Sequence, residues 1–380
     1  MSVYWNERTR RLQPYVPGEQ PKDRNFIKLN TNENPYPPSP KVIEALRKAA
    51  DNTLKLYPDP TCTELRETAA ARFGVKAGQV FAGNGSDEIL AFAFAAFFGK
   101  LTQEDKSGEE FLLFPDITYS FYPVYADLWD VPYKTIPVKE DFSIDVAPYL
   151  EMIHHGNSSG VIFPNPNAPT GIALPLDVFK KIATAAEERK RVLVVDEAYI
   201  AFCQKACGQG TCGSTIPYIN DFPNLLVVRT LSKEASLAGL RSGLAFGSEE
   251  LIEGLCRVRD SFNSYTMDRL ALAGTVAALN DASYYDEINS RVIATRDRVS
   301  SGLKALRFKV LPSEANFLFA APPEGSGKNG RELFAALRER GILVRHFNKP
   351  EIADFLRISM GTDEDMDVFL KACQEIILKQ

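Results

Sequence analysis

The chain has 380 residues, of which 45% are hydrophobic and 24% are charged. This length and composition are typical of a globular protein with one large domain and one smaller domain. The net charge of −5 argues against a nucleic-acid-binding surface, and the longest apolar run, 89–98, is about half the length of a membrane span. Because Met1–Leu12 is polar and lacks the apolar core of a signal peptide, we expect a cytoplasmic protein with no membrane or nucleic-acid partner.

The first 40 residues are rich in proline and cannot form a long helix. We expect them to form an extended arm that lies on other parts of the fold. Within the arm, Leu29–Pro35 contains a row of short polar side chains that can bond to backbone or to a ligand. The patterns of 40–52 and 63–73 then predict two helices.

From about residue 80 to residue 246, short apolar strands alternate with helical segments. This alternation predicts an α/β fold with a mostly parallel sheet wrapped by helices. One long helical stretch, 268–306, follows, and then short strands and helices predict a smaller α+β domain. We therefore expect an N-terminal arm at 1–40, which contributes to the small domain and to a dimer contact, a large domain at 41–275, and a small domain at 276–380.

Polar residues follow several of the predicted strands. The strand at 192–195 leads to Asp196, and the strand at 225–228 leads to Lys233. Ligands of α/β proteins bind at the carboxyl ends of strands, and a partly desolvated lysine there can form a Schiff base with an aldehyde. A single lysine in such a place is more often a solvated surface residue, so the prediction depends on several strand ends converging.

Two other strand ends carry weaker signals. The glycine-rich turn Gly83–Glu88 opens an apolar helix, whose free N–H groups suit an anion. Tyr119 follows a strand at 111–114, where it either stacks on a planar ligand or belongs to the core.

Together these residues resemble the fold-type I, pyridoxal-phosphate-dependent aminotransferases, and most closely their histidinol-phosphate aminotransferase branch. The resemblance runs from about Leu12 to the C-terminus. It implies a large domain with a seven-stranded, mostly parallel sheet and a smaller α+β domain. The motifs that carry it are Leu29–Pro35, Tyr57–Pro60, Gly85–Glu88, Asn165–Gly171, Asp196–Tyr199, Thr230–Lys233 with Arg241, and Leu356–Thr362.

The resemblance implies a role in cofactor chemistry for four residues. Lys233 would hold pyridoxal 5'-phosphate covalently and would later move a proton as a base beside the reacting carbon. Asp196 would pair with the pyridine N–H and so keep the ring an electron acceptor. Tyr119 would stack on the ring, and Tyr199 would bond to its phenolic oxygen.

The resemblance also assigns the cofactor phosphate. Ser232, Arg241 and the backbone amides of Ser86 and Asp87 would hold it, and Tyr57 would reach the phosphate of a neighbouring subunit.

Substrate contacts follow from the same resemblance. Tyr15 would line the neighbour's substrate pocket, so a homodimer with shared active sites is expected. Arg357 would bind the substrate phosphate or carboxylate, and Arg345 would add a second positive charge. Asn32, in the polar row of the arm, is also assigned to the substrate.

The chain departs from the family pattern at two positions. Ala168 stands where the family has an asparagine that bonds the cofactor, so Asn167 or Asn165 would have to reach it instead, and we assign Asn167 to the cofactor site. Glu234 follows Lys233 where a small residue is usual, and the sequence offers no reason for it.

Cys203, Cys207 and Cys212 lie close together in the sequence. Their spacing is not that of a zinc site and no histidine is nearby, so we expect ordinary thiols and no metal.

The implied reaction is transamination of L-histidinol phosphate with 2-oxoglutarate, in histidine biosynthesis. Three alternatives remain open: an aromatic amino-acid aminotransferase, a threonine-phosphate decarboxylase and, from another class, an α/β binding protein without catalysis. Yellow absorbance of the purified protein would distinguish the last from the others.

Overall fold

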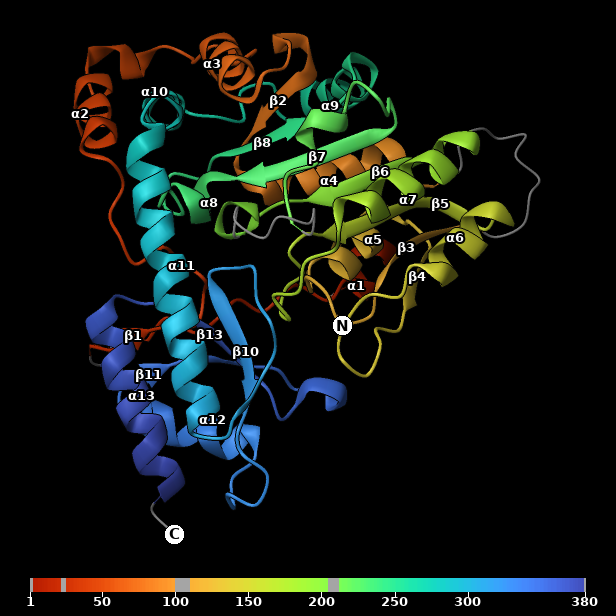
Figure 1. Ribbon diagram of the computed structural model, residues 1–380. Coiled ribbons are helices and arrows are strands. Elements are labelled where there is room, and N and C mark those ends of the chain that lie inside the picture. Colours follow the sequence, from red (N-terminus) through yellow and green to blue (C-terminus); the bar gives the residue numbers. More distant parts are fainter. Residues whose placement is uncertain (1–2, 22–24, 100–109, 204–211, 379–380) are drawn as a thin grey trace.

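The computed structural model describes residues 3–21, 25–99, 110–203 and 212–378. Its large domain is built on a seven-stranded sheet with the order β2-β8-β7-β6-β5-β3-β4 (Figure 1). The strands pair in parallel, except that β8 is antiparallel to both of its neighbours. The expected seven-stranded, mostly parallel α/β sheet is therefore confirmed. The strands are β2 (Val80–Gly83), β3 (Phe111–Pro115), β4 (Tyr133–Ile136), β5 (Ser158–Pro164), β6 (Val192–Asp196), β7 (Leu225–Thr230) and β8 (Gly243–Phe246).

Helices cover both faces of this sheet. Successive strand residues point to opposite faces, so Val194 packs into one apolar cluster and Val195 into the other. The cluster of Val194 contains α4 (Gly85–Phe97), α5 (Tyr122–Trp129) and α9 (Glu249–Phe262). The cluster of Val195 contains α3 (Thr63–Phe73), α6 (Ala147–His154), α7 (Leu176–Glu188) and α10 (Arg269–Leu279), with α2 (Pro40–Ala49) beside it.

The small domain has a four-stranded antiparallel sheet with the order β12-β13-β10-β9. Strand β1 of the N-terminal arm pairs in parallel with β11, so the arm joins this domain. A separate apolar cluster lies among its helices. The elements are β1 (Ile27–Lys28), α11 (Ala282–Ala305), β9 (Lys309–Val310), β10 (Phe317–Ala321), α12 (Gly330–Glu339), β11 (Ile342–Leu343), β12 (Arg345–His346), β13 (Leu356–Ser359) and α13 (Asp363–Leu378). Helix α1 (Glu7–Arg11) of the arm lies instead against the large domain, where Arg8 and Arg11 pair with Asp130 at the end of α5 (Figure 1).

The helical stretch expected at 268–306 is present, but the chain divides it into two helices, α10 and α11. They separate at Asp281, whose buried carboxylate accepts hydrogen bonds from Ser39 Oγ at 2.5 Å and Lys41 Nζ at 2.6 Å. The expected domain boundary at 275 lies inside α10, and Leu279 of that helix packs in the core of the large domain. The start of α11 packs there too, through Tyr285 and Ile288, whereas Val292 and Val299 pack in the cluster of the small domain. We therefore propose that the domains divide within α11, which runs from one domain into the other (Figure 1).

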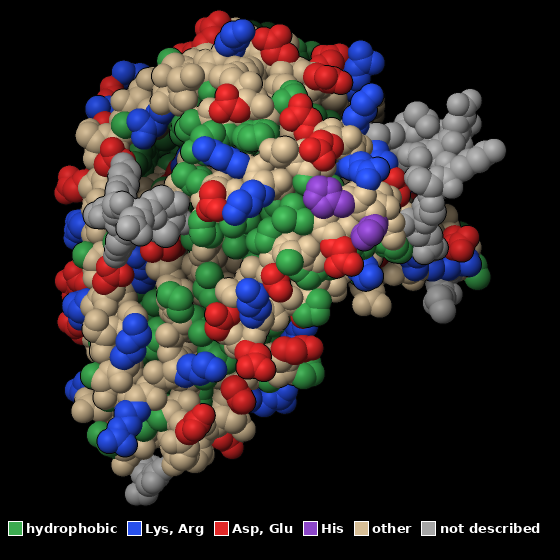
Figure 2. Space-filling model, turned by 45° about the vertical axis from the view of Figure 1, so that its right-hand side comes forward, with side chains coloured by type: hydrophobic (Ala, Val, Ile, Leu, Met, Phe, Trp, Pro, Cys, Tyr) green, Lys and Arg blue, Asp and Glu red, His purple; other side chains and the backbone are tan. Residues whose placement is uncertain are grey.

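Short 3-10 turns connect several of these elements. They cover Asn52–Lys55, Ala77–Gln79, Ile200–Phe202, Ile216–Tyr218 and Pro350–Ile352. No helix in the described ranges is both long and apolar enough to cross a membrane. On the face in Figure 2, acidic and basic side chains are interspersed, and hydrophobic side chains gather near its middle.

Candidate active site

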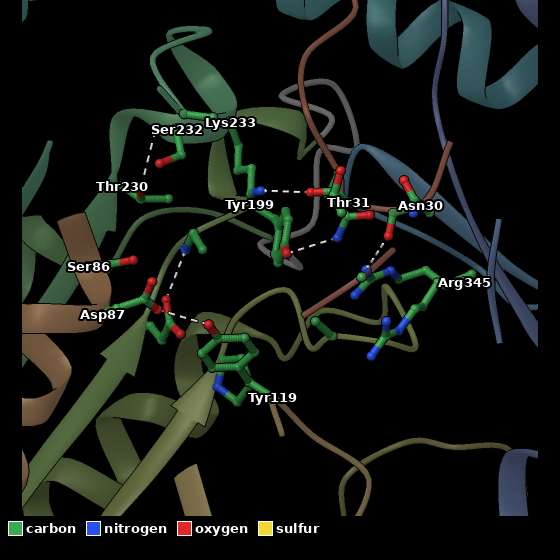
Figure 3. A pocket seen from close by; sticks show the side chains of 18 of the residues that line it. Asn30, Thr31, Ser86, Asp87, Tyr119, Tyr199, Thr230, Ser232, Lys233 and Arg345 are labelled. Carbon is green, nitrogen blue, oxygen red and sulfur yellow. Dashed lines mark hydrogen bonds between the residues drawn. The ribbon is translucent and has the colours of Figure 1, made fainter. Parts of the chain in front are cut away.

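The carboxyl ends of β5, β6 and β7 meet the N-terminal arm and the small domain at a cavity of about 180 Å³ (Figure 3). This is the edge where parallel α/β sheets bind ligands. The last residues of the three strands, Pro164, Asp196 and Thr230, all line it. The other lining residues are Tyr15, Gly18, Asn30, Thr31, Asn32, Ser86, Asp87, Tyr119, Ala168, Ala198, Tyr199, Ser232, Lys233, Ala238, Arg241, Arg345 and Arg357.

Lys233 lies in α8 (Leu231–Glu234), a single turn that begins directly at the end of β7. The Thr230 side chain caps this turn by accepting a hydrogen bond from the Ser232 amide at 3.1 Å. Lys233 Nζ donates to the Thr31 carbonyl at 3.0 Å. Burial, and then the positive charge of Arg357, lower the pKa of Lys233 to about 8. More of its amine is therefore neutral near pH 7 than for a solvated lysine.

Asp196 is a buried carboxylate at the end of β6, with 4% of its surface exposed. The Tyr122 hydroxyl donates to its Oδ2 at 3.0 Å, and the Ala198 amide donates to its Oδ1 at 3.2 Å. Burial raises the pKa of Asp196 to about 7. No cationic side chain among the described residues pairs with it. The buried Asp196 carboxylate is therefore suited to accept a hydrogen bond from a positively charged N–H group.

The opposite part of the cavity is suited to an anion. Helix α4 begins at Gly85, so the backbone N–H groups of its first turn, at Ser86 and Asp87, have no partner within the helix. Arg241 Nη2 donates to Asp87 Oδ2 at 3.1 Å, which places a guanidinium beside this turn. A side chain at Gly243 would lie 2.6 Å from the Ser86 nitrogen, so glycine is needed for β8 to pass so close.

Two tyrosines border the cavity and are held by hydrogen bonds. Tyr119 donates its hydroxyl to Asp87 Oδ1 at 2.8 Å. The Tyr199 hydroxyl accepts from Asn32 Nδ2 at 2.9 Å. Ser359 donates to Asn32 Oδ1 at 2.8 Å, which fixes the Asn32 amide so that its NH₂ group faces Tyr199.

The small domain contributes two arginines. Arg345 on β12 and Arg357 on β13 are directly paired positions in the antiparallel sheet. Arg357 donates to the Asn30 carbonyl at 3.1 Å, and its Nε is buried without a partner. Burial lowers the pKa of Arg357, and no carboxylate in the described ranges forms an ion pair with either arginine. Two adjacent cations without a carboxylate partner suit an anionic substrate.

The model of the family "Aminotransferase class I and II" matches residues 24–373. The chain belongs to this family. It is 50% identical over 377 residues to a histidinol-phosphate aminotransferase of Clostridium acetobutylicum, covering 99% of this chain and 100% of the relative. It is 51% identical over 377 residues to histidinol-phosphate aminotransferase 1 of Bordetella parapertussis, covering 99% of both chains. These relatives confirm the expected family and branch.

Solved structures agree with the aminotransferase fold. The crystal structure of a histidinol-phosphate aminotransferase from Sinorhizobium meliloti, in complex with pyridoxal-5'-phosphate, matches with a TM-score of 0.84. The match covers 99% of this chain and 98% of that chain at 24% identity. At that identity the match shows a common fold, and the site residues have to be argued from their own geometry.

Most residues assigned from the aminotransferase pattern line the same cavity, but Asn167 does not. Its Nδ2 donates to the Ile117 carbonyl at 2.9 Å and to Thr170 Oγ1 at 3.2 Å, and its side chain borders a separate cavity beside Leu174. Asn165 likewise accepts from the Leu174 amide at 2.8 Å. The assignment of Asn167 to the cofactor is therefore wrong in this structure, and Ala168 borders the active-site cavity instead.

The two tyrosines assigned to a neighbouring subunit differ from each other. Tyr15 lines the cavity of its own chain, where its ring centroid lies 4.5 Å from that of Phe121. Its assignment to the neighbour's pocket stays a prediction. Tyr57 lies outside the cavity with 77% of its surface exposed, and it stacks on Tyr265 with ring centroids 4.6 Å apart.

Sequence reasoning missed Tyr122 and the backbone of Thr31. Tyr122 lies three positions after Tyr119 and begins α5, but nothing in its sequence pattern points to Asp196, which is 74 positions away. Thr31 lies in the polar row that the sequence singled out, yet its carbonyl rather than its side chain contacts Lys233.

The cysteines also differ from expectation. Cys203 and Cys212 are joined by a disulfide, so the prediction of ordinary thiols is wrong for these two. Cys207 lies outside the described residues.

Proposed function

We propose that this aminotransferase transfers the amino group of L-histidinol phosphate to 2-oxoglutarate, with pyridoxal 5'-phosphate as cofactor, in histidine biosynthesis. The observation that supports this substrate is the arginine pair Arg345 and Arg357, which lines a small cavity. Two cations suit a doubly charged phosphate, and the same pair suits the carboxylates of the second substrate. The names of the relatives, at about half identity over the whole chain, support the same reaction.

The residues of the cavity fit the cofactor at each of its functional groups. Asp196, buried without a cationic partner, fits a protonated ring nitrogen. Lys233, with its lowered pKa, fits an aldehyde carbon. The first turn of α4, Arg241 and Ser232 fit a phosphate. When bound, pyridoxal phosphate supplies an electrophilic carbon and a ring that accepts electrons from the substrate.

The side chains of the cavity transfer the proton and orient the cofactor and the substrate. Lys233 Nζ takes the proton from the substrate carbon that bears the amine and returns it at the next step, because its pKa lies near the working pH. The Asp196 carboxylate holds a proton on the ring nitrogen. Asn32 donates to the Tyr199 hydroxyl, which leaves the Tyr199 proton free for an oxygen in the cavity. Arg345 and Arg357 orient the substrate by its anionic group.

A comparison of substrates tests the role of Arg345. We expect Arg345→Gln to lower kcat/KM for histidinol phosphate by about 10–100-fold, the usual worth of one hydrogen bond to a charged group, and to change phenylalanine turnover little. Threonine phosphate serves as a third substrate, and carbon dioxide release would reveal decarboxylation. Arg340→Gln, an exposed change at the C-cap of α12, is the matched control. Faster turnover of phenylalanine than of histidinol phosphate by the unaltered protein would contradict the proposal.

We further propose a homodimer in which Tyr57 reaches the active site of the neighbouring subunit. The support is an exposed apolar patch around the Tyr57–Tyr265 stack, where Leu54, Leu56 and Phe262 are each more than half exposed. Patches of large apolar side chains commonly mark protein interfaces. The cytoplasmic location expected from the sequence stays a prediction.

Subunit exchange tests the shared site. In a mixture of Tyr57→Phe and Lys233→Ala dimers, each mixed dimer has one intact site, because its Lys233 and its Tyr57 come from different chains. We expect activity after exchange to exceed the weighted mean of the parents several-fold. Differently tagged chains show that exchange has occurred. Activity that stays at the mean after exchange would place Tyr57 in its own subunit's site or outside both.

A further inference from the structure

A second cavity, of about 490 Å³, lies on the other side of the lysine-bearing turn α8. Ser232 and Lys233 line the active-site cavity, whereas Leu231, Glu234 and Ala235 line the second one. The turn α8 is therefore the partition between the two cavities. The second cavity is larger than the first and falls within the range of small-molecule sites, roughly 300–1,000 Å³.

This arrangement gives Glu234 a place. Its carboxylate forms an ion pair with Arg229, and both side chains face the second cavity rather than the first. The Arg229 guanidinium also lies over the Phe73 ring, 5.1 Å from its centroid. Glu234 follows the catalytic lysine in sequence, but its carboxylate belongs to the lining of the second cavity.

The lining of the second cavity combines apolar side chains with two arginines, Arg72 and Arg229, and two carboxylates, Glu234 and Asp286. Phe73, Ile200, Tyr285 and Ile293 contribute large apolar surfaces. Arg72, at the end of α3, also lines the cavity and lies over the Phe73 ring at 6.0 Å. In the described part of the chain, Arg72 forms no ion pair with a carboxylate. An apolar body with one carboxylate would match this lining.

The second cavity is linked by hydrogen bonds to the backbone of the catalytic lysine. Asn289, which lines it, donates to the Glu234 carbonyl at 3.0 Å and accepts from Asn34 Nδ2 at 3.1 Å. Asn34 Nδ2 also lies 3.1 Å from the Lys233 carbonyl, to which it donates. A molecule that moves Asn289 or Glu234 would therefore move the peptide that positions Lys233.

We propose that this second cavity binds a small organic carboxylate with an apolar body, and that its occupancy alters the position of Lys233. The carboxylate pairs with Arg72, and the body packs between Phe73 on α3 and Ile293 on α11. The effect on the reaction is on turnover rather than on substrate affinity, because the ligand does not enter the active-site cavity.

The test measures binding of indole-3-propionate to the cofactor-loaded protein by titration calorimetry. Arg357→Gln removes the active-site cation that could also hold a carboxylate, and Ile293→Trp fills the second cavity. Ser290→Trp, on the same lining, fills it from an exposed position in case Ile293→Trp does not fold. Arg72→Gln removes the proposed partner of the carboxylate, and Arg47→Gln, exposed on α2, is its matched control.

We expect the unaltered protein and Arg357→Gln to bind the probe with similar affinity. Arg72→Gln should weaken binding by about 10-fold or more, the effect of losing one charged hydrogen bond, and a filled cavity should abolish it. Saturating probe should change kcat with KM constant. The proposal is overturned if Arg357→Gln abolishes binding of the probe while a cavity-filling variant still binds it. It is also overturned if the unaltered protein does not bind the probe at any concentration up to its solubility.

Discussion

Lys233→Ala is expected to lower kcat by roughly 10⁴-fold, the upper end of what a positioned general acid–base supplies. The variant removes the only atom at the end of β7 that this mechanism uses both to hold the cofactor and to move a proton. The measurements are single-turnover kinetics with histidinol phosphate and the absorbance of the bound cofactor. We expect the cofactor to remain bound without a covalent link, because the groups assigned to its phosphate and ring nitrogen are untouched.

Lys181→Ala is the control for this experiment. Lys181 is exposed on α7, pairs with Asp177 and does not line the cavity. It should leave kcat unchanged. Transamination by Lys233→Ala at the rate of the unaltered protein would refute the assignment of Lys233.

Asp196→Asn should have the second largest effect, about 10²–10³-fold on kcat, comparable to the loss of one preorganised charge-stabilising group. The amide has nearly the shape of the carboxylate and can still accept from Tyr122, but it cannot keep a proton on the ring nitrogen. The expected sign is a slow proton-abstraction step, seen as a larger isotope effect with deuterated substrate, together with weaker cofactor binding. Unchanged single-turnover kinetics would count against the role of Asp196.

Asp196→Asn should lower activity but raise the stability of the cofactor-free protein. Burial raises the folded-state pKa of Asp196 to about 7, above its unfolded value near 4. Between these values the folded state binds a proton that the unfolded state has released, so stability falls as pH rises from 4 to 7. We expect cofactor-free Asp196→Asn to melt at a higher temperature than the unaltered protein at pH 8, and the difference to disappear near pH 4. A lower melting temperature at pH 8 would show that the ionised carboxylate is not costly in the fold.

Much of this architecture could be predicted from local pattern. The alternation of apolar strands with helices specified the α/β sheet, because side-chain period and chain breaks are set by neighbouring residues. The helix Thr63–Phe73 has the bounds that its pattern indicated. Asp196 and Lys233 could be placed at one edge of the sheet without coordinates, because the carboxyl ends of parallel strands meet there.

The tertiary structure decided where side chains point once they reach that edge. The sequence shows that residue 167 is an asparagine but not the direction of its side chain. The Asn167 amide donates to the carbonyl of Ile117, 50 positions away, and therefore does not face the active-site cavity. Tyr122 reaches Asp196 across 74 positions. The sequence offers no reason for Glu234 beside Lys233. In the structure its carboxylate pairs with Arg229 on the side of α8 that faces the second cavity. Sequence periodicity thus determined most of the elements, although not the break between α10 and α11. Contacts between distant segments determined which groups share a cavity, because those contacts have no local signature.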